Sequence, residues 1–466
     1  MGACPASLSA APSAAPSADT SRSAVEAVLA EMQAAVLAGD IPGYLKHVAT
    51  DDPIFRKEQE NWAADLEKFK PAQFILAIRP DPSPTPDPAP APEGDAKQPA
   101  APSPEQLWKD RPAEFGPTRA RFTLTMTWMM PQTENDAGPQ GKGGRTRTVE
   151  YPVVFERAAD GRWLFKGEEW QVMELKPGAE GAPDGFAGVR VKYDPGLEGM
   201  AKAVIAAMPE VRAHVDEGFE QRIDRVQEVK LYGSMAHLQA SIYLSYSDSL
   251  GGWNEPHESI KLLGRAGRQG GAGLKTVMAH EYGHVATFEF GEKATDAPWW
   301  VLEGVADLAA AKFRTNPVER VNAIVHGWAR RGRLAKWEDI TDFRNTKGAL
   351  MGNVYTQGEH MMLYVSDRFG RAKRNAWLRA MAAGKTIDQA TRDALGLSFA
   401  DLDADWRAEI DRRVKAEDEA KAREPAEPGE PGAPPQAPKA PAGEDLTPPG
   451  KPKMTPEQPR EVPRAG

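Results

Sequence analysis

Apolar residues recur with a helical period in the first part of the chain and then alternate with polar ones. The helical period predicts an amphipathic helix that ends at Gly39-Asp40, and a second helix near Lys57–Phe69. Alternation, with a hairpin turn signal at Asp160-Gly161, predicts antiparallel strands after these helices. The predicted strands are Arg119–Trp128, Arg147–Glu156 and Arg162–Glu174. Helices followed by such strands predict an α+β domain over about residues 23–175.

A second domain is predicted over residues 188–415, where short strands come first and helices dominate from residue 274. Its elements are predicted at Val189–Tyr193 (strand), Leu197–Phe219 (helix), Val226–Tyr232 (strand) and 258–263 (edge strand). The chain is therefore expected to be of the α+β class, with two domains joined by a linker at 176–187.

Proline is concentrated in three segments, which together hold 26 of the 41 prolines. They are residues 1–22, 80–104 and 416–466. The same segments are rich in Ala, Ser, Glu and Lys, so they bury little apolar surface. We expect a disordered N-terminal tether, a Pro-rich insertion in the first domain and a disordered C-terminal tail.

The strongest chemical signal is the segment His280-Glu281-Tyr282-Gly283-His284, which reads H-E-x-x-H. On a helix its two histidines lie one turn apart on the same face, where two imidazoles can bind one metal ion. Glu281 points about 100° away, which suits a base that accepts a proton from water on the metal. Eighteen residues separate His284 from Glu303, which offers a third ligand. Two histidines and one glutamate are typical of catalytic zinc, which keeps a fourth position open.

Both ligand segments are predicted to be helical. Apolar residues at helical spacing surround the two histidines up to the stop signal Gly291, and Asp296 and Pro298 are start signals before Glu303. Asp307 lies one helical turn after Glu303 and can accept the other ring N–H of a ligand histidine, which would fix its tautomer. One zinc ion per chain is expected.

On these residues, the segment Val277–Leu308 resembles the gluzincin zinc peptidases, the group that includes the thermolysin and aminopeptidase N families. The gap of eighteen residues and the pair Trp299-Trp300 are most similar to the aminopeptidase side. The resemblance implies a small sheet, then zinc-binding helices, then a helical subdomain. The roles it implies are zinc binding for His280, His284 and Glu303, general base for Glu281, and orientation of a ligand histidine for Asp307.

A Tyr-x-x-Gly sequence, Tyr355 to Gly358, extends the resemblance. In aminopeptidases of this group a tyrosine in such a context donates to the oxyanion of the tetrahedral intermediate, and the resemblance implies that role for Tyr355. Two alternatives stay open, a Tyr355 that packs at a helix start and a donor role for His360.

Upstream, Gly251–Glu255 lacks the Met-Glu-Asn order with which those aminopeptidases bind the free amino terminus of a substrate. The choice between endopeptidase and exopeptidase action therefore stays open, and Glu255 and His257 are interpreted as loop residues. The first domain resembles the cone-shaped nuclear-transport-factor-two-like fold in its order of elements. No acid–base pair is evident in that domain, which is expected to be an accessory or docking module.

Charge and cysteine content bear on partners and location. The net charge is −9, and no basic patch with interleaved aromatic residues is present, so no nucleic-acid partner is expected. No apolar stretch reaches the length of a transmembrane span. The single cysteine, Cys4, ends a segment that resembles the tail of a bacterial lipoprotein cleavage box. This predicts a membrane tether through Cys4 in the cell envelope, or secretion, with a start site assigned too late in a signal peptide. A cytoplasmic chain with a free thiol is the alternative.

These observations lead to one expected function and one alternative. We expect a zinc-dependent peptidase that acts on peptide or protein substrates, with Glu281 as the general base. The alternative is a non-catalytic zinc- or peptide-binding envelope protein on a peptidase scaffold. Substrate identity does not follow from the sequence, because no motif marks the subsites.

Overall fold

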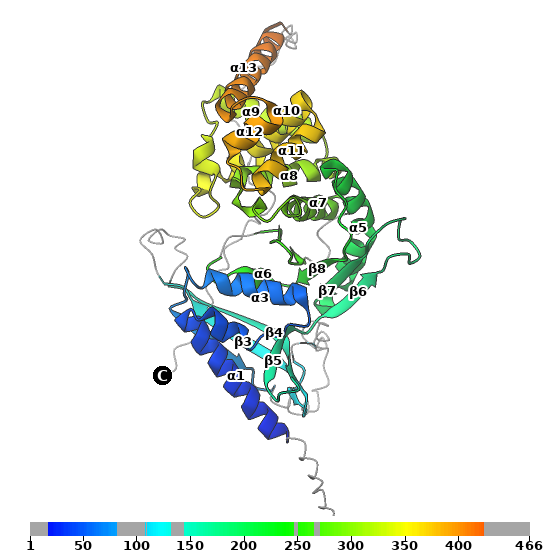
Figure 1. The fold of residues 1–466 in the computed structure, drawn as a ribbon, viewed down its shortest axis with the longest axis vertical. Helices are drawn as coiled ribbons and strands as arrows, with labels where there is room; N and C mark the ends of the chain where they lie inside the picture. Colours follow the sequence, from blue (N-terminus) through cyan, green and yellow to red (C-terminus); the bar gives the residue numbers. More distant parts are fainter. Residues whose placement is uncertain are drawn as a thin grey trace, which may run out of the picture. The chain divides into compact units, whose positions relative to one another are not determined.

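A computed structural model describes residues 17–81, 108, 110–131, 144–246, 250–264 and 271–423 (Figure 1). Contacts between residues divide the chain into two compact units. Unit 1 comprises Met1–Pro209, Asp224–Asp248 and Trp253–Gln269, and unit 2 comprises Glu210–Ile223, Ser249–Gly252 and Gly270–Gly466. The domain boundaries 23–175 and 188–415 were drawn from sequence patterns and stay a prediction.

Unit 1 begins with three helices followed by an antiparallel sheet, in the order that the sequence predicts. The helices are α1 (Ala18–Ala38), α2 (Ile41–Leu45) and α3 (Pro53–Asp65). The sheet has the order β1-β3-β4-β5, and β2 pairs with β3. Its strands are β1 (Gln73–Ile78), β2 (Glu114–Phe115), β3 (Arg119–Met129), β4 (Thr146–Arg157) and β5 (Trp163–Glu168). The likeness to the nuclear-transport-factor-two-like fold stays a prediction.

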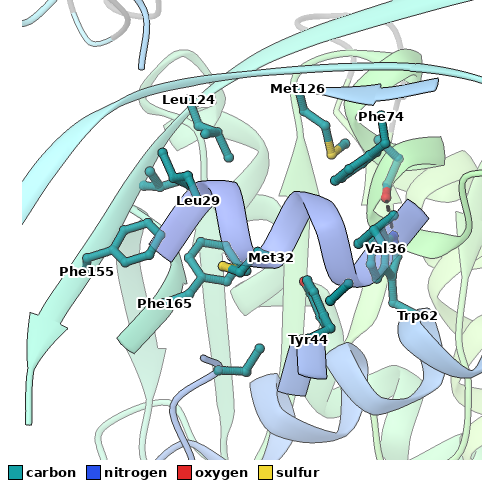
Figure 2. Packing of buried hydrophobic residues seen from close by; sticks show 14 of the residues in the cluster. Leu29, Met32, Val36, Tyr44, Trp62, Phe74, Leu124, Met126, Phe155 and Phe165 are labelled. Carbon is teal, nitrogen blue, oxygen red and sulfur yellow. Dashed lines mark hydrogen bonds between the residues drawn. The ribbon is translucent and has the colours of Figure 1, made fainter. Parts of the chain in front are cut away.

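The core of this part lies between α1 and the sheet (Figure 2). Helix α1 buries apolar side chains that recur every three or four residues. Strand β3 buries apolar side chains at alternate positions along the strand. These side chains are Val25, Leu29, Met32 and Val36 on α1, and Phe122, Leu124, Met126 and Trp128 on β3. Gly39 ends α1 in a left-handed conformation with φ of 69°, where its N–H donates to the carbonyl of Ala35.

A second sheet has the strand order β6-β7-β8-β10-β9. Its strands are β6 (Gln171–Leu175), β7 (Val189–Tyr193), β8 (Gln227–Tyr232), β9 (Gly252–Trp253) and β10 (Ile260–Leu263). Strands β7, β8 and β10 run parallel, and helix α5 (Glu198–Phe219) connects β7 to β8. All six residues of β8 are buried, as expected for a parallel strand that is covered on both faces.

Two predictions for these strands are wrong. The predicted strand Arg162–Glu174 is two strands, since β5 ends at Glu168 and β6 starts at Gln171 and pairs with β7. Alternation has the same period in both pieces and cannot show a change of partner strand. The segment 258–263 is not at the edge of the sheet, because β10 lies between β8 and the two-residue strand β9.

Unit 2 is largely helical among the residues described. Its main helices are α7 (Gly271–Phe288), α8 (Trp299–Ala310), α9 (Pro317–Arg330), α10 (Gly358–Phe369), α11 (Arg371–Ala382), α12 (Ile387–Leu395) and α13 (Phe399–Arg423). A π-helical turn, η7 (Asn353–Gln357), leads directly into α10. Such turns are rare and are often found at functional sites.

Two predicted disordered segments are partly helical. Helix α1 starts at Ala18, inside the predicted tether 1–22, because the Ser17 hydroxyl accepts the N–H of Thr20 and caps the helix. Helix α13 continues to Arg423, inside the predicted tail 416–466, where Glu419 and Arg423 form an i, i+4 ion pair.

Several predictions concern residues outside the described ranges. They are the tether residue Cys4, the Pro-rich insertion from residue 82 onward and the tail beyond residue 423. None of the helices in the described ranges is both long and apolar enough to cross a membrane.

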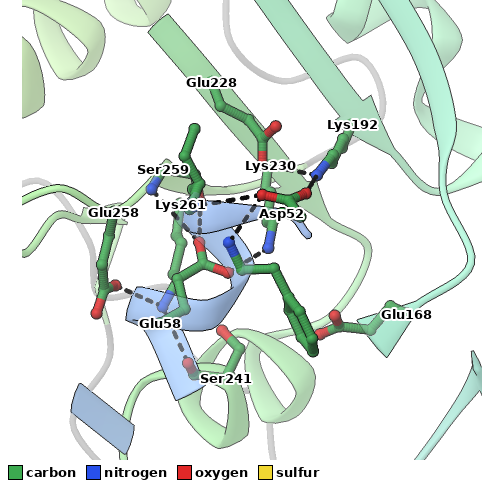
Figure 3. A network of polar contacts seen from close by, with 12 residues as sticks. Asp52, Glu58, Glu168, Lys192, Glu228, Lys230, Ser241, Glu258, Ser259 and Lys261 are labelled. Atoms are coloured by element: carbon green, nitrogen blue, oxygen red, sulfur yellow. Dashed lines mark hydrogen bonds and ion pairs between the residues drawn. The ribbon is translucent and has the colours of Figure 1, made fainter. Parts of the chain in front are cut away.

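Buried charges join helix α3 to the second sheet inside unit 1 (Figure 3). Lys230 on β8 and Lys261 on β10 are each only 2% exposed. The Lys230 ammonium donates to the buried carboxylate of Glu58 on α3, and Lys261 Nζ donates to Glu258 Oε2 at 2.9 Å. Glu58 also accepts the hydroxyl of Ser259. Helix α3 therefore supplies the counter-charge for a lysine that the sheet buries.

The attraction between Glu58 and the two buried lysines shifts the pKa values of the groups in this network. Burial alone would raise the pKa of Glu58, but the charges of Lys230 and Lys261 outweigh it and lower that pKa. Burial alone would lower the pKa of Lys230, yet the charge of Glu58 raises it well above its ordinary value. Both groups are therefore held in their charged forms at neutral pH.

A cavity of about 50 Å³ lies in the apolar interior of unit 1. It contains an acid–base pair that the sequence did not suggest, Glu168 at the end of β5 and His237 on helix α6 (Met235–Ile242), with Oε1 and Nε2 3.7 Å apart. Burial alone would raise the pKa of Glu168, but His237 and Lys230 lower it to about 2. An apolar cavity of roughly 150 Å³ is needed for a ligand such as benzene, so this one suits water rather than an organic ligand.

Candidate metal centre

Three side chains on two adjacent helices of unit 2 point their ligand atoms at one place. His280 and His284 lie on α7 and Glu303 lies on α8. The two Nε2 atoms are 3.2 Å apart, and Glu303 Oε2 is 3.2 Å from Nε2 of His280 and 3.5 Å from Nε2 of His284. Ligands about 2.0–2.1 Å from a tetrahedral zinc ion lie about 3.3 Å from one another. The three distances fit such an ion.

The donor atoms are also chemically suited to a cation. Glu303 Oε2 is buried and makes no hydrogen bond within the described residues. Burial alone would raise the pKa of Glu303, but His284 and His280 lower it, so this carboxylate is ionised. A buried anionic oxygen needs a cation beside it, which here is a histidine that carries a proton, as in the ion pair with His280, or a metal ion. The residues therefore fit zinc.

Small residues let the helices of the site approach closely. A Cβ atom on Gly283 of α7 would lie 3.1 Å from Cα of Ala306 on α8. A Cβ on Gly358 would lie 2.4 Å from the carbonyl oxygen of Trp300, and one on Gly304 would lie 2.4 Å from the carbonyl carbon of Gly358. The glycine of the Tyr-x-x-Gly sequence thus allows the turn that carries Tyr355 to pack directly against the helix that carries Glu303.

Asp307 on α8 lies beside one histidine of the candidate centre. Its Oδ1 lies 3.0 Å from Nδ1 of His280. Burial alone would raise the pKa of Asp307, but the hydrogen bond and charge of His280 lower it. An ionised carboxylate can only accept, so Nδ1 of His280 carries the hydrogen and its Nε2 is left for a metal. Nδ1 of His284 has no such partner among the described residues.

Two residues that the sequence reasoning missed extend this contact. Arg314 donates to Asp307 Oδ1 and, at 3.1 Å, to Oε2 of Glu359. Burial, followed by the charge of Asp307, raises the pKa of Glu359 to about 8. Arg314 lies beyond the end of α8, after the short turn Ala311–Phe313, so helical spacing from Asp307 gave no signal for this contact. Glu359 had no sequence signal beyond its place after Gly358.

Glu281 is buried beside the ligands, with 5% of its surface exposed. Burial is the main cause that raises its pKa. A Cβ atom on Gly252 would lie 2.5 Å from Glu281 Oε1, so a larger residue at position 252 would displace this carboxylate. The segment that lacks the Met-Glu-Asn order therefore contributes a glycine to the surroundings of Glu281. In unit 1, Glu255 accepts the hydroxyl of Tyr243 at 2.9 Å, and His257 is exposed.

Tyr355 lies next to the candidate metal ligands, and His360 does not. The rings of Tyr355 and His280 are stacked, with centroids 6.1 Å apart. His360 is buried, and its Nδ1 accepts the indole N–H of Trp406 at 2.8 Å. Burial lowers the pKa of His360 to about 3. His360 is thus a neutral core residue that accepts a hydrogen bond from Trp406.

Residues 208–412 match the Peptidase MA superfamily. The matched segment includes the residues of the candidate centre, and the match supports a metallopeptidase. A search of curated proteins finds no match to the chain.

Solved structures with some likeness include the M1 zinc metallopeptidase from Deinococcus radiodurans, at 14% identity and a TM-score of 0.34. Another is a two-domain M1 zinc metallopeptidase bound to L-arginine, at 14% identity and a TM-score of 0.32. Each alignment covers 63% of this chain and 63% of the other chain, so this chain spans less than two thirds of their length.

Proposed function

We propose that the protein is a zinc-dependent peptidase that hydrolyses peptide bonds in peptide or protein substrates. This proposal rests on the geometry of three ligand atoms. Two histidine nitrogens and one carboxylate oxygen lie 3.2–3.5 Å from one another, next to the buried Glu281. The match of residues 208–412 to the Peptidase MA superfamily supports it.

The residues of the chain divide the work of hydrolysis among them. His280, His284 and Glu303 would hold zinc, which when bound supplies a Lewis acid that acidifies water and polarises a carbonyl. Glu281 removes a proton from the attacking water and later gives it to the leaving amine. Its raised pKa brings it nearer to neutral pH, where a group can both accept and donate a proton. Tyr355 donates its phenol O–H to the oxyanion of the tetrahedral intermediate.

The function is tested by incubating the full chain with a denatured proteome and identifying the new peptide termini. Cuts are expected with zinc-loaded protein, are expected to vanish after chelation, and should return when zinc is added back. The positions of the cuts relative to substrate ends would also separate endopeptidase from exopeptidase action. Protein that holds zinc but produces no cuts would contradict the proposal and favour the non-catalytic zinc- or peptide-binding alternative.

Zinc binding is expected to depend on Glu303 and on pH. Glu303→Ala should abolish tight binding, because two histidines alone hold zinc poorly. In the metal-free protein, burial would lower the pKa of His280, but Asp307 and Glu303 raise it, so His280 carries a proton at neutral pH. That proton must leave when zinc binds, so affinity should rise about tenfold per pH unit below this pKa.

Competition with a chromophoric chelator at several pH values measures both effects. Glu292→Ala removes an exposed carboxylate from the same region and serves as the control, with zinc affinity unchanged. Full zinc occupancy in Glu303→Ala, or an affinity that falls as pH rises, would refute the assignment.

Tyr355→Phe should lower kcat by about 10²–10³-fold with little change in KM, since an oxyanion donor acts mainly in the transition state. The ring remains, so its stacking on His280 and the zinc content should be preserved. Steady-state kinetics and metal analysis check this. An unchanged kcat would return Tyr355 to a packing role, and a markedly lower melting temperature would show that the hydroxyl serves the fold.

A further inference from the structure

The two carboxylate oxygens of Glu303 have different surroundings. Oε2 faces the Nε2 atoms of His280 and His284 and makes no hydrogen bond among the described residues. Oε1 accepts the indole N–H of Trp299 at 2.8 Å. One oxygen is therefore directed to the candidate metal position, while the other is already occupied by a protein donor.

Trp299 is held firmly in the place from which it donates. It is the first residue of α8 and lies one turn before Glu303, so the two side chains share a helix face. Its backbone N–H donates to the carbonyl of Thr341 at 2.8 Å, and only 6% of its surface is exposed. Its ring meets those of Phe343 and Tyr355 edge to face, at 5.1 and 6.2 Å. The indole cannot move without disturbing several contacts.

We propose that Trp299 is a positioning residue that restricts Glu303 to binding zinc through Oε2 alone. This inference rests on the proposed zinc site. Binding through both oxygens would require Oε1 to leave the indole N–H, which would then be buried without an acceptor. A glutamate that offers one oxygen leaves three protein ligand atoms in all. The fourth position, which a catalytic zinc site needs for water and substrate, then stays open.

The neighbouring tryptophan shows that the contact is specific to Trp299. Trp300 is completely buried, and its indole N–H has no hydrogen-bond partner among the described residues. Its ring packs against that of Trp337 with centroids 4.2 Å apart. Trp300 serves the core, so Trp300→Phe makes the same chemical change as Trp299→Phe without removing a donor from Glu303.

The test compares zinc-loaded wild type, Trp299→Phe and Trp300→Phe by X-ray absorption, which counts the light ligands of zinc, and by chelator competition. In the wild type, one glutamate oxygen is expected at about 2.0–2.2 Å together with two histidine nitrogens. Trp299→Phe should gain a second carboxylate oxygen at longer distance and change zinc affinity by about 10–100-fold, as other partners of metal ligands do. Trp300→Phe should lower the melting temperature but keep the wild-type ligand count.

Each other outcome has a definite meaning. A glutamate bound through both oxygens in the wild type would overturn the proposal without any variant, even if Trp299→Phe failed to fold. Identical ligand counts and affinities in wild type and Trp299→Phe would also overturn it, while a zinc-dependent peptidase activity would still stand. Wild-type protein that binds no zinc at all would instead remove the proposed function on which the inference rests.

Discussion

Glu281→Gln is expected to lower peptide hydrolysis by about 10²–10⁴-fold, the range that a general base contributes, while zinc content stays at one ion per chain. Glutamine keeps the size of the side chain and its helix propensity but cannot accept the proton of the attacking water. Since Glu281 is not one of the three convergent ligand residues, the metal site should be unaffected. Cleavage rates and metal analysis of the same preparations measure both parts of the expectation.

The pH dependence of the wild type follows from the same residue. Burial raises the pKa of Glu281, and only the ionised carboxylate can act as a base. The rate should therefore fall as pH drops through this raised pKa and level off above it. Glu292→Gln is the matched control, because it makes the same change at an exposed position and should leave the rate unchanged. Wild-type cleavage by Glu281→Gln would show that another group is the base.

Glu58→Ala is expected to destabilise the protein by about 3–5 kcal/mol, which is the cost of breaking a buried ion pair from one side. The substitution leaves the Lys230 ammonium, 2% exposed, without its carboxylate, and it removes the acceptor of the Ser259 hydroxyl. Because the lowered pKa of Glu58 keeps it ionised at neutral pH, the wild-type pair contributes fully there. It should weaken as pH falls through that lowered pKa.

Urea unfolding at pH 7 measures this effect. Glu60 on the same helix pairs with Arg56 at 2.8 Å but is 41% exposed, so Glu60→Ala should change stability by less than about 1 kcal/mol. Replacing both members of the buried pair, as in Glu58→Leu with Lys230→Leu, should recover much of the loss. Equal effects of Glu58→Ala and Glu60→Ala would show that the buried network contributes no more than a surface pair.

The same network predicts that residues 188–415 do not form a stable domain by themselves. That segment retains Lys230 and Lys261 but lacks α3 and therefore Glu58. Its second sheet would bury Lys230 without an acidic partner from α3. Activity measurements intended to test the peptidase thus need the full chain.

Features that depend on short-range spacing could be predicted from the sequence. His280 and His284 share a helix face because they are four residues apart, and the structure brings them together with Glu303. The helix that ends at Gly39 and the strands β3, β4, β7 and β8 were also predicted from period and turn residues, with ends within a few residues of those observed. In these cases the backbone geometry of a single element fixes which side chains share a face.

Contacts between remote segments were decided only by the tertiary structure. Glu228 and Lys230 on β8 are charged yet buried, and Glu58 on α3 contacts Lys230 on that face of the strand. Three further features join residues that are far apart in sequence or on different elements. They are the pairing of β6 with β7, the contact of Glu168 with His237, and the contacts that Arg314 makes with both Asp307 and Glu359. Tyr355 reaches His280 only because Gly304 and Gly358 let two helices touch. Residue spacing specifies faces within one element, whereas the packing of elements against each other determines which faces meet and which charges lose their water.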